Sequence, residues 1–202
     1  FPGSEDVEMK DSDLGPMPEG FKVKKLDEIC EITIGTSPKS KFYNDEGNGL
    51  PFHQGVSDFG RIFPKENRYC SKIKRVAEKG ELLFSVRAPV GRMNIADQRI
   101  VIGRGLYALK AKNGFQEFFI EQMKYKFPED NVMGSGTVFN SVNKKIMKNL
   151  DLIYPQQALL KKFIFLVRPI YNEMEKLTNL NEVLKQARDL LLPRLISGEI
   201  EV

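Results

Sequence analysis

The feature that most constrains this chain is an apolar seam in its last quarter. From Gln156 onward, apolar residues recur every three or four positions. A sustained mixture of these spacings is typical of a coiled-coil seam rather than of a helix that simply covers a core. A helix over residues 156–191 would be about 50 Å long. The seam consists of Leu159, Phe163, Leu166, Ile170, Met174, Leu177, Leu180, Leu184, Ala187 and Leu191.

A helix of this kind cannot bury its apolar stripe alone, so another helix must cover it. That partner helix lies in a second copy of the chain, in a missing half of the same polypeptide, or in another subunit. Pro169 is expected to kink the helix, because proline removes a backbone donor and clashes with the preceding turn.

The region before the seam predicts an α+β globule with an irregular mixed sheet. Residues 28–34, 81–87 and 98–109 are rich in Val, Ile, Phe and Tyr, and Gly or Pro interrupts the pattern about every ten residues. Helices are expected from about Gln116 to Lys126, with Phe118, Phe119, Gln122 and Met123 on one face, and from about Asn143 to Leu150. The sequence thus predicts a globular domain over residues 20–154 and a long C-terminal coiled-coil helix over residues 155–202.

The charge is distributed unevenly along the 202 residues. The chain has a net charge of +4, yet residues 1–19 carry six acids and only one lysine. This acidic segment contains Gly15-Pro16-Met17-Pro18 and few large apolar residues, so it predicts a linker. The basic surplus of the remaining residues favours a polyanionic partner. The chain begins at Phe1 rather than methionine, which suggests a fragment or a trimmed chain.

Several kinds of site are excluded or disfavoured. His53 is the sole histidine and Cys30 and Cys70 form no CxxC pair, so a structural zinc site lacks ligands, and two free buried thiols are expected. Neither a phosphate-binding P-loop nor a G-x-S-x-G elbow is present. Residues 103–108 fit G-x-G-x-x-A formally, but a strand-like segment follows where the dinucleotide motif requires a helix. We therefore predict no catalytic residues, no metal and no cofactor on this chain.

No apolar run reaches eighteen residues, and no basic-then-apolar leader is visible. The sequence therefore predicts a cytoplasmic protein that does not associate with a membrane.

Clusters of small polar and basic residues are the remaining candidates for function, and their chemistry suits DNA. Hydroxyls, lysines and backbone amides in turns contact phosphates, whereas arginine and glutamine can pair with base edges. The loop before the second expected helix could also attract phosphate through free amides. The candidate DNA-binding residues are Thr36, Ser37, Lys39, Lys41, His53, Gln54, Ser57, Arg61, Arg87, Arg92, Arg104, Ser135, Thr137, Asn140, Lys144 and Lys145.

Each cluster also has a purely structural interpretation. The turn at residues 35–41 could be a solvated loop, and His53 could be a hydrogen-bonded core histidine. Arg87, Arg92 and Arg104 could form internal ion pairs with Asp97 or Glu81. The serine at position 141 could act only as a helix cap.

Five segments together carry a resemblance to a known family. They are residues 12–21, 80–91, 102–106, 134–139 and 191–199, the last reading Leu-Leu-Pro-Arg-Leu-Ile-Ser-Gly-Glu. These segments resemble the specificity (S) subunits of type I restriction-modification enzymes. Phe21 stands where this family usually has tryptophan. The resemblance covers nearly the whole chain, and its motifs are specific jointly rather than individually.

The resemblance implies more than the residues show. A complete subunit of this family has two target recognition domains and two long antiparallel helices, and each domain reads one half of a bipartite DNA site. This chain has one of each, so it resembles the C-terminal half of a subunit or a half-length subunit that dimerises. The family implies double-stranded DNA, methyltransferase (M) subunits that use S-adenosylmethionine, and restriction (R) subunits as partners.

We therefore expect a non-catalytic, sequence-specific DNA-binding subunit. A recognition module from a related restriction enzyme is a first alternative. A coiled-coil scaffold with an incidental basic surface and a small nucleotide-binding enzyme are alternatives from other classes. Loss of DNA affinity after replacement of Lys39, Arg87 and Arg104 would separate the first hypothesis from the scaffold.

Overall fold

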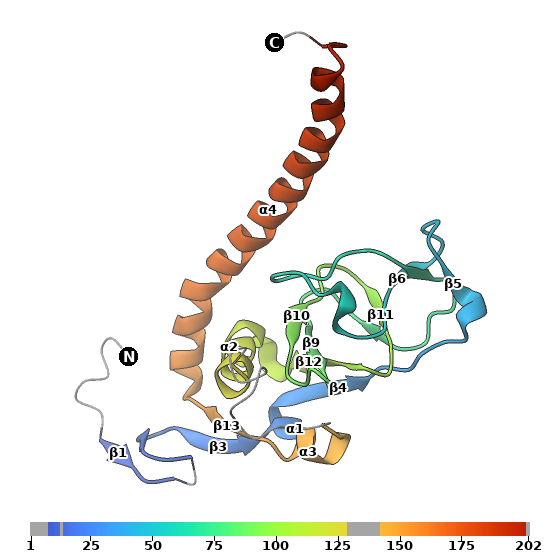
Figure 1. Cartoon of the computed structure of the whole chain (residues 1–202). Coiled ribbons are helices and arrows are strands. Elements are labelled where there is room, and N and C mark those ends of the chain that lie inside the picture. The colour runs from blue at the N-terminus through green and yellow to red at the C-terminus, as the bar shows by residue number, and fades with distance from the viewer. Residues whose placement is uncertain (1–7, 13, 129–141, 201–202) are drawn as a thin grey trace. The chain divides into compact units, whose positions relative to one another are not determined.

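The computed structural model describes residues 8–12, 14–128 and 142–200 (Figure 1). The chain divides into two compact units, residues 1–161 and 162–202. The first unit contains all of the described strands. The second consists mainly of the long C-terminal helix.

One sheet of the first unit has four antiparallel strands in the order β10-β9-β12-β4. The central strands β9 and β12 are buried almost throughout, as expected for strands covered on both faces. The strands are β4 (Cys30–Ile34), β9 (Leu82–Ser85), β10 (Met93–Ile95) and β12 (Leu106–Ala111).

A second sheet has five short strands in the order β5-β7-β6-β11-β8. Its β6–β11 pair is parallel and the other pairs are antiparallel, so this sheet is mixed, as the sequence predicted. The strands are β5 (Tyr43–Asn44), β6 (Leu50–His53), β7 (Tyr69–Cys70), β8 (Val76–Ala77) and β11 (Ile100–Ile102). The 3₁₀ turns η1 (Ser40–Phe42) and η2 (Val56–Asp58) lie in its connections.

The core runs through both sheets. One buried cluster joins residues of β8, β9, β11 and β12, and Phe59 packs against it. A smaller cluster is centred on Phe52, whose ring stacks on that of Tyr43 at 4.5 Å. Cys30 and Cys70 are buried free thiols, as predicted, and burial raises the pKa of Cys30 to about 12.

The two ends of the globular region pair with each other. Strand β3 (Lys22–Lys25) forms an antiparallel pair with β13 (Asp151–Tyr154), and Lys25 lies 2.8 Å from Asp151. Helices α1 (Leu26–Ile29) and α3 (Lys144–Lys148) flank this pair. The segment before it contains a short antiparallel ladder, β1 (Met9–Lys10) with β2 (Met17–Pro18).

Helix α2 (Gln116–Lys126) has the bounds that the sequence predicted. Phe119, Ile120 and Met123 are its buried residues, whereas Phe118, expected on the same face, is only half-buried. Gln122 donates to the Ile153 carbonyl and accepts from its amide, which anchors α2 to β13. The short turn η3 (Lys112–Gly114) precedes the helix.

Three predicted elements need correction. The segment 28–34 begins as the end of α1, because β4 starts only at Cys30. The segment 98–109 is two strands, since the chain turns at residues 103–105. The helix expected over 143–150 spans only Lys144–Lys148, with Asn143 as its N-cap: its Oδ1 accepts from the Ile146 amide at 2.9 Å.

Helix α4 runs from Gln157 to Ile196, within the predicted range 155–202 and five residues beyond the last seam residue, Leu191. At 1.5 Å per residue its 40 residues span about 60 Å. Pro169 and Pro193 both lie inside it and do not interrupt it. Its ribbon bends gradually in Figure 1.

Candidate nucleic-acid interface

Three segments far apart in the sequence meet at a backbone crossing in the first unit. The amide of Gly103 donates to the His53 carbonyl at 2.8 Å, and that of Gly105 donates to the Gln54 carbonyl at 3.2 Å. The amide of Gly35 donates to the Leu106 carbonyl at 3.0 Å. The crossing therefore joins the ends of β4, β6 and β11.

The backbone segments approach each other so closely at this crossing that a residue with a Cβ atom does not fit. A Cβ atom on Gly35 would lie 2.0 Å from the Gly103 carbonyl oxygen, and one on Gly105 would lie 2.6 Å from the Gln54 carbonyl oxygen. The G-x-G of residues 103–105 thus serves chain packing, and the strand β12 follows it in place of a helix. The structure supports the exclusion of a dinucleotide motif at this position.

Polar side chains of the three segments are linked on top of the crossing. Ser37 Oγ donates to Gln54 Oε1 at 2.8 Å and accepts from the Arg104 amide at 3.2 Å. The adjacent Thr36 donates its amide to the Ile102 carbonyl. Gln54 and Arg104 are exposed, whereas Thr36 and Ser37 are half-buried. Four candidates from three separate sequence clusters therefore belong to one site.

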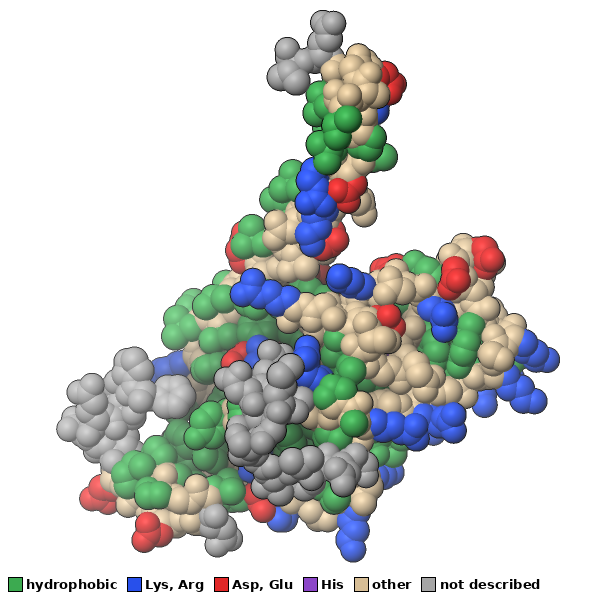
Figure 2. Space-filling view, viewed as in Figure 1, with side chains coloured by type: hydrophobic (Ala, Val, Ile, Leu, Met, Phe, Trp, Pro, Cys, Tyr) green, Lys and Arg blue, Asp and Glu red, His purple; other side chains and the backbone are tan. Residues whose placement is uncertain are grey.

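Exposed cations continue from this crossing along one edge of the unit, which we call the basic edge. Lys41 and Lys72 both lie over the ring of Phe42, at 5.2 and 4.9 Å. Figure 2 shows Lys and Arg side chains gathered over the segment between β4 and β5. The basic edge consists of Lys39, Lys41, Lys72, Lys74, Arg75 and Arg104, all of them exposed.

Lys72, Lys74 and Arg75 were missed in the sequence. Three cations within four residues could have drawn attention to this run. No sequence pattern, however, indicated that it lies near the turn at Lys39 and Lys41. The connection is made by the Ser71 amide, which donates to the Phe42 carbonyl at 3.0 Å. Ile102 likewise donates to the Arg75 carbonyl, which brings the run beside the crossing.

His53 does not fit the prediction of a DNA contact. Its side chain is 1% exposed, so DNA cannot reach it in this structure. It is not the satisfied core histidine of the alternative either, since neither ring nitrogen has a hydrogen-bond partner among the described residues. Nδ1 lies 3.6 Å from Asp58 Oδ2. Burial lowers the pKa of His53, although Asp58, Asp97 and Glu66 oppose that shift.

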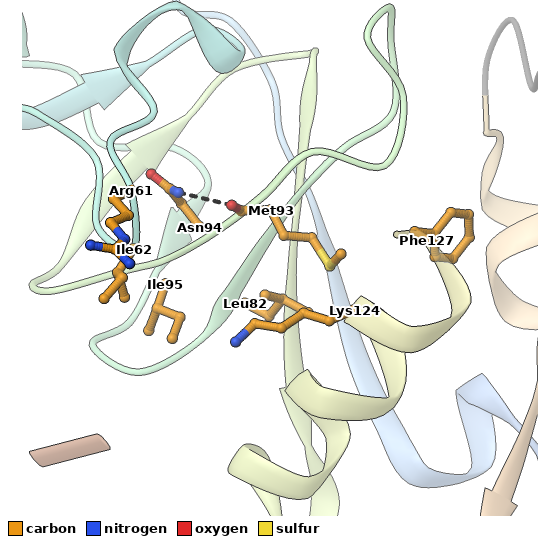
Figure 3. A pocket seen from close by; sticks show the side chains of 8 residues that line it. All are labelled: Arg61, Ile62, Leu82, Met93, Asn94, Ile95, Lys124 and Phe127. Carbon is orange, nitrogen blue, oxygen red and sulfur yellow. Dashed lines mark hydrogen bonds between the residues drawn. The ribbon is translucent and has the colours of Figure 1, made fainter. Parts of the chain in front are cut away.

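Ser57 and Arg61 are exposed on the loop that follows β6. Ser57 Oγ contacts Asp58, whereas Arg61 lies at a pocket of about 320 Å³ (Figure 3). Both therefore remain accessible, and the expectation that Arg61 contacts a phosphate stays a prediction. The pocket is lined by Arg61, Ile62, Leu82, Met93, Asn94, Ile95, Lys124 and Phe127.

A second group of candidates lies at the C-terminal end of β9, where the Val86 amide donates to the Gly105 carbonyl of the crossing at 3.0 Å. Arg87 follows β9 and is exposed, and Arg92 is half-buried just before β10. The Val142 amide donates to the Val86 carbonyl at 3.2 Å, which brings the start of α3, with its exposed Lys144 and Lys145, to this end of the strand. Ser135, Thr137 and Asn140, together with Ser141, lie outside the described residues.

Among the described residues, neither Arg87 nor Arg104 forms the internal ion pair with Asp97 or Glu81 that the alternative proposed. Among neighbouring charges, Lys110 lowers the pKa of Glu81. Glu66 raises the pKa of Asp97, and His53 lowers it. Neither Arg87 nor Arg104 is among these charges. Burial raises the pKa of both carboxyl groups.

The predicted seam is largely uncovered along α4. From Leu166 to Leu191 six of its leucine and isoleucine side chains are between 47% and 67% exposed. Leu159, Phe163 and Met174 are half-buried. Among the exposed apolar residues of α4 are further members outside the seam: Phe165, Val183, Leu190, Leu192, Leu195 and Ile196. A single helix of this composition exposes a surface that fits a partner helix.

Within the described part of the chain, no set of three His, Cys, Asp or Glu side chains is placed to hold a metal ion. Among the same residues, no helix combines the length and apolarity needed to cross a bilayer.

Comparison with known proteins decides the family. The model of the type I restriction modification DNA specificity domain matches residues 18–185. The chain belongs to this family. Its match covers the crossing, the basic edge and most of α4, so all three are parts of a type I DNA specificity domain.

Relatives of this specificity domain are longer proteins. The putative type I restriction enzyme MjaX specificity subunit of Methanocaldococcus jannaschii is 34% identical over 201 residues, covering 96% of this chain and 46% of that protein. The HsdS subunit of Thermoanaerobacter tengcongensis, a crystal structure, is 31% identical with a TM-score of 0.66, covering 98% and 49%.

A further structure comes from a study of complex assembly and conformational transition of the type I R-M system. It is 33% identical with a TM-score of 0.68 and covers 95% of this chain and 48% of the other. The chain thus spans about half the length of the relatives it matches, and the α+β fold with a long C-terminal helix is shared with them.

Proposed function

We propose that this chain recognises a specific DNA sequence as part of a type I restriction-modification specificity subunit, and that it reads one half of a bipartite site. The observation that carries this proposal is the junction of exposed Gln54 and Arg104 with the basic edge. Lysines beside a duplex supply sequence-independent attraction to phosphates, whereas arginine and glutamine can discriminate base edges. The match to the type I DNA specificity domain covers both Gln54 and Arg104 and supports a role for them in binding DNA.

Residues 20–154 form the target recognition domain in this proposal, residues 155–202 the long helix and residues 1–19 a linker. The pairing of β3 with β13 supports the bounds 20–154, because these two strands join the beginning of this region to its end. The backbone contact of Val142 supports a second contact area formed by Arg87, Lys144 and Lys145. Arg61 and Ser57 would approach DNA from a neighbouring loop.

The exposed seam of α4 supports a second helix as its cover. We place that helix in the other half of the same subunit or in a second copy, where a rigid spacer would set the distance between two half-sites. Methyltransferase subunits with bound S-adenosylmethionine, and restriction subunits, are then the chains on which modification and cleavage occur. The complex acts in the cytoplasm, where its DNA substrate lies.

The test is selection from a randomised duplex library by the chain, with and without its methyltransferase partner, followed by sequencing of the retained DNA. The proposal predicts enrichment of a short motif, or of two motifs at a fixed spacing. Retention without any motif, or no retention even with the partner, would contradict it. A coiled-coil scaffold, favoured only by the exposed seam, would then be the better account.

A further inference from the structure

We infer that Gln54 is a specificity-determining residue that presents its amide to a base edge as a hydrogen-bond donor, and that the base is guanine. This inference rests on the proposed function. It goes beyond it by assigning one residue, one atom and one class of base contact.

The orientation of the Gln54 amide follows from its neighbours. The Arg104 amide can only donate, so Ser37 Oγ acts as its acceptor at 3.2 Å. The Ser37 hydroxyl donates its own proton to Gln54 Oε1 at 2.8 Å. Because Oε1 faces the crossing, Nε2 with its two protons is the outward end of this exposed side chain.

Gln54 is also held in place by the backbone beneath it. Its carbonyl accepts from the Gly105 amide at 3.2 Å. A Cβ atom on Gly103 would lie 2.9 Å from Gln54 Oε1 and 3.0 Å from Cδ, so the side chain rests directly on a glycine. A recognition group fixed in both main chain and side chain is preorganised for binding.

This orientation changes the base that Gln54 fits. Glutamine pairs with adenine by using Oε1 as acceptor and Nε2 as donor together. In this site Oε1 bonds Ser37 and lies over Gly103, so the outward donor end is the one that a base edge can reach. The exposed Arg104, whose amide shares the same serine, adds further donors beside it. Guanine presents two acceptors, N7 and O6, in the major groove and matches such a pair of donors best.

Two substitutions test the donor role in opposite ways. Gln54→Glu keeps an oxygen for Ser37 and replaces the outward donor by an acceptor. Ser37→Ala releases Oε1, so that Gln54 regains the acceptor needed for adenine. Ser197→Ala is the matched control, because Ser197 is an exposed serine outside the candidate site whose hydroxyl bonds the Arg194 carbonyl.

The experiment is selection from the randomised duplex library by the assembled specificity subunit with its methyltransferase partner. Wild type and Ser197→Ala are expected to share a motif that contains guanine. Gln54→Glu should lose the preference for one guanine by about tenfold, and Ser37→Ala should admit adenine at that same position. Thermal unfolding of each variant within a few degrees of wild type shows that the fold is retained.

The outcomes separate this inference from the proposed function. A wild-type motif that both Gln54→Glu and Ser37→Ala retain at every position overturns the role of Gln54 and leaves DNA recognition intact. A wild-type motif without guanine overturns the choice of base. The absence of any motif in the wild type removes the proposed function itself.

Discussion

Asn94 holds Gly60 by two hydrogen bonds, one in each direction. Its Nδ2 donates to the Gly60 carbonyl at 3.1 Å, and its Oδ1 accepts from the Gly60 amide at 3.0 Å. Asn94 is 3% exposed and lies on β10, whereas Gly60 belongs to the loop that carries Ser57 and Arg61. The pair therefore attaches this candidate DNA-contacting loop to the four-stranded sheet.

Replacing Asn94 by alanine should destabilise the protein. The variant leaves the Gly60 carbonyl without this partner, a loss that costs about 1–3 kcal/mol when the group stays buried, whereas the Gly60 amide keeps the Phe63 carbonyl at 3.1 Å. Chemical denaturation measures the free energy of unfolding. The control is Asn67→Ala, since Asn67 is exposed and bonds Asp58 on the surface; it should change stability by less than about 0.5 kcal/mol. Equal losses in both variants would refute the two-point attachment.

The backbone crossing predicts a sharp difference between two glycines. Gly35→Ala places a methyl group against the Gly103 carbonyl, so the backbone must shift, at a cost of about 1–3 kcal/mol or more. Gly55→Ala, a few residues from the same crossing, meets no atom within 4 Å and should be nearly neutral. Unfolding midpoints of the two proteins provide the comparison. A tolerated Gly35→Ala would mean that the backbones of the crossing lie farther apart.

Burial of His53 predicts a pH dependence of stability. Its pKa in the folded protein is lowered from 6.5, so the unfolded chain binds more protons as the pH falls below that value. Stability should therefore decline as the pH falls through about 6.5 toward the lower folded pKa. Asp97, whose pKa burial raises, acts in the opposite sense at lower pH.

The difference between wild type and His53→Gln isolates the histidine from these carboxyl groups. Thermal unfolding between pH 7.5 and 5.5 should show a steeper loss for wild type than for the variant. Parallel pH profiles would contradict the assignment of a buried, neutral imidazole.

The basic edge predicts the salt dependence of DNA binding. The double variant Lys41→Gln with Lys72→Gln removes two cations that lie over Phe42, and each lost phosphate contact should lower the slope of log Kd against log salt by about 0.9. The control replaces two other cations by glutamine. They are Arg99, which pairs with Glu78, and Lys110, whose charge lowers the pKa of Glu81. A control slope reduced as much as the test slope would show that overall charge, rather than the edge, sets affinity.

The exposed seam of α4 predicts association through this helix. Leu177→Lys together with Leu184→Lys should abolish pairing with a partner helix, because charges would replace two buried knobs. Asn179→Lys with Asn181→Lys, outside the seam, is the charge-matched control. Sedimentation of the chain alone and mixed with the other half of the subunit reports the outcome. Association that survives the leucine substitutions would exclude the seam as the interface.

Local patterns predicted the parts of the fold that local physics determines. The bounds of α2 followed from one amphipathic face and its flanking glycine, and the length of α4 followed from a regular seam. The pairing of β6 with β11 was not predictable, because it joins residues about fifty positions apart and no short pattern encodes that choice. Glu28, assigned to a strand-like segment from its sequence, belongs to α1.

The candidate site shows the same division. Residue chemistry identified Ser37, Gln54 and Arg104 individually, but only the strand pairing brings them together. His53 was misjudged for the reverse reason: its position in β6 directs it inward, and a short strand gives little alternation to reveal this. The run from Lys72 to Arg75 was overlooked because its neighbour at Phe42 is thirty residues earlier in the chain.

The most direct test of sequence-specific recognition is a competition between two duplexes for the assembled subunit at one fixed salt concentration. One duplex carries the selected motif and the other carries the same bases in scrambled order. Recognition of sequence predicts that the motif binds about a thousandfold more tightly. Equal Kd values for the two duplexes would show a basic surface that holds DNA without reading it, and would contradict the role proposed for Gln54, Arg104 and the basic edge.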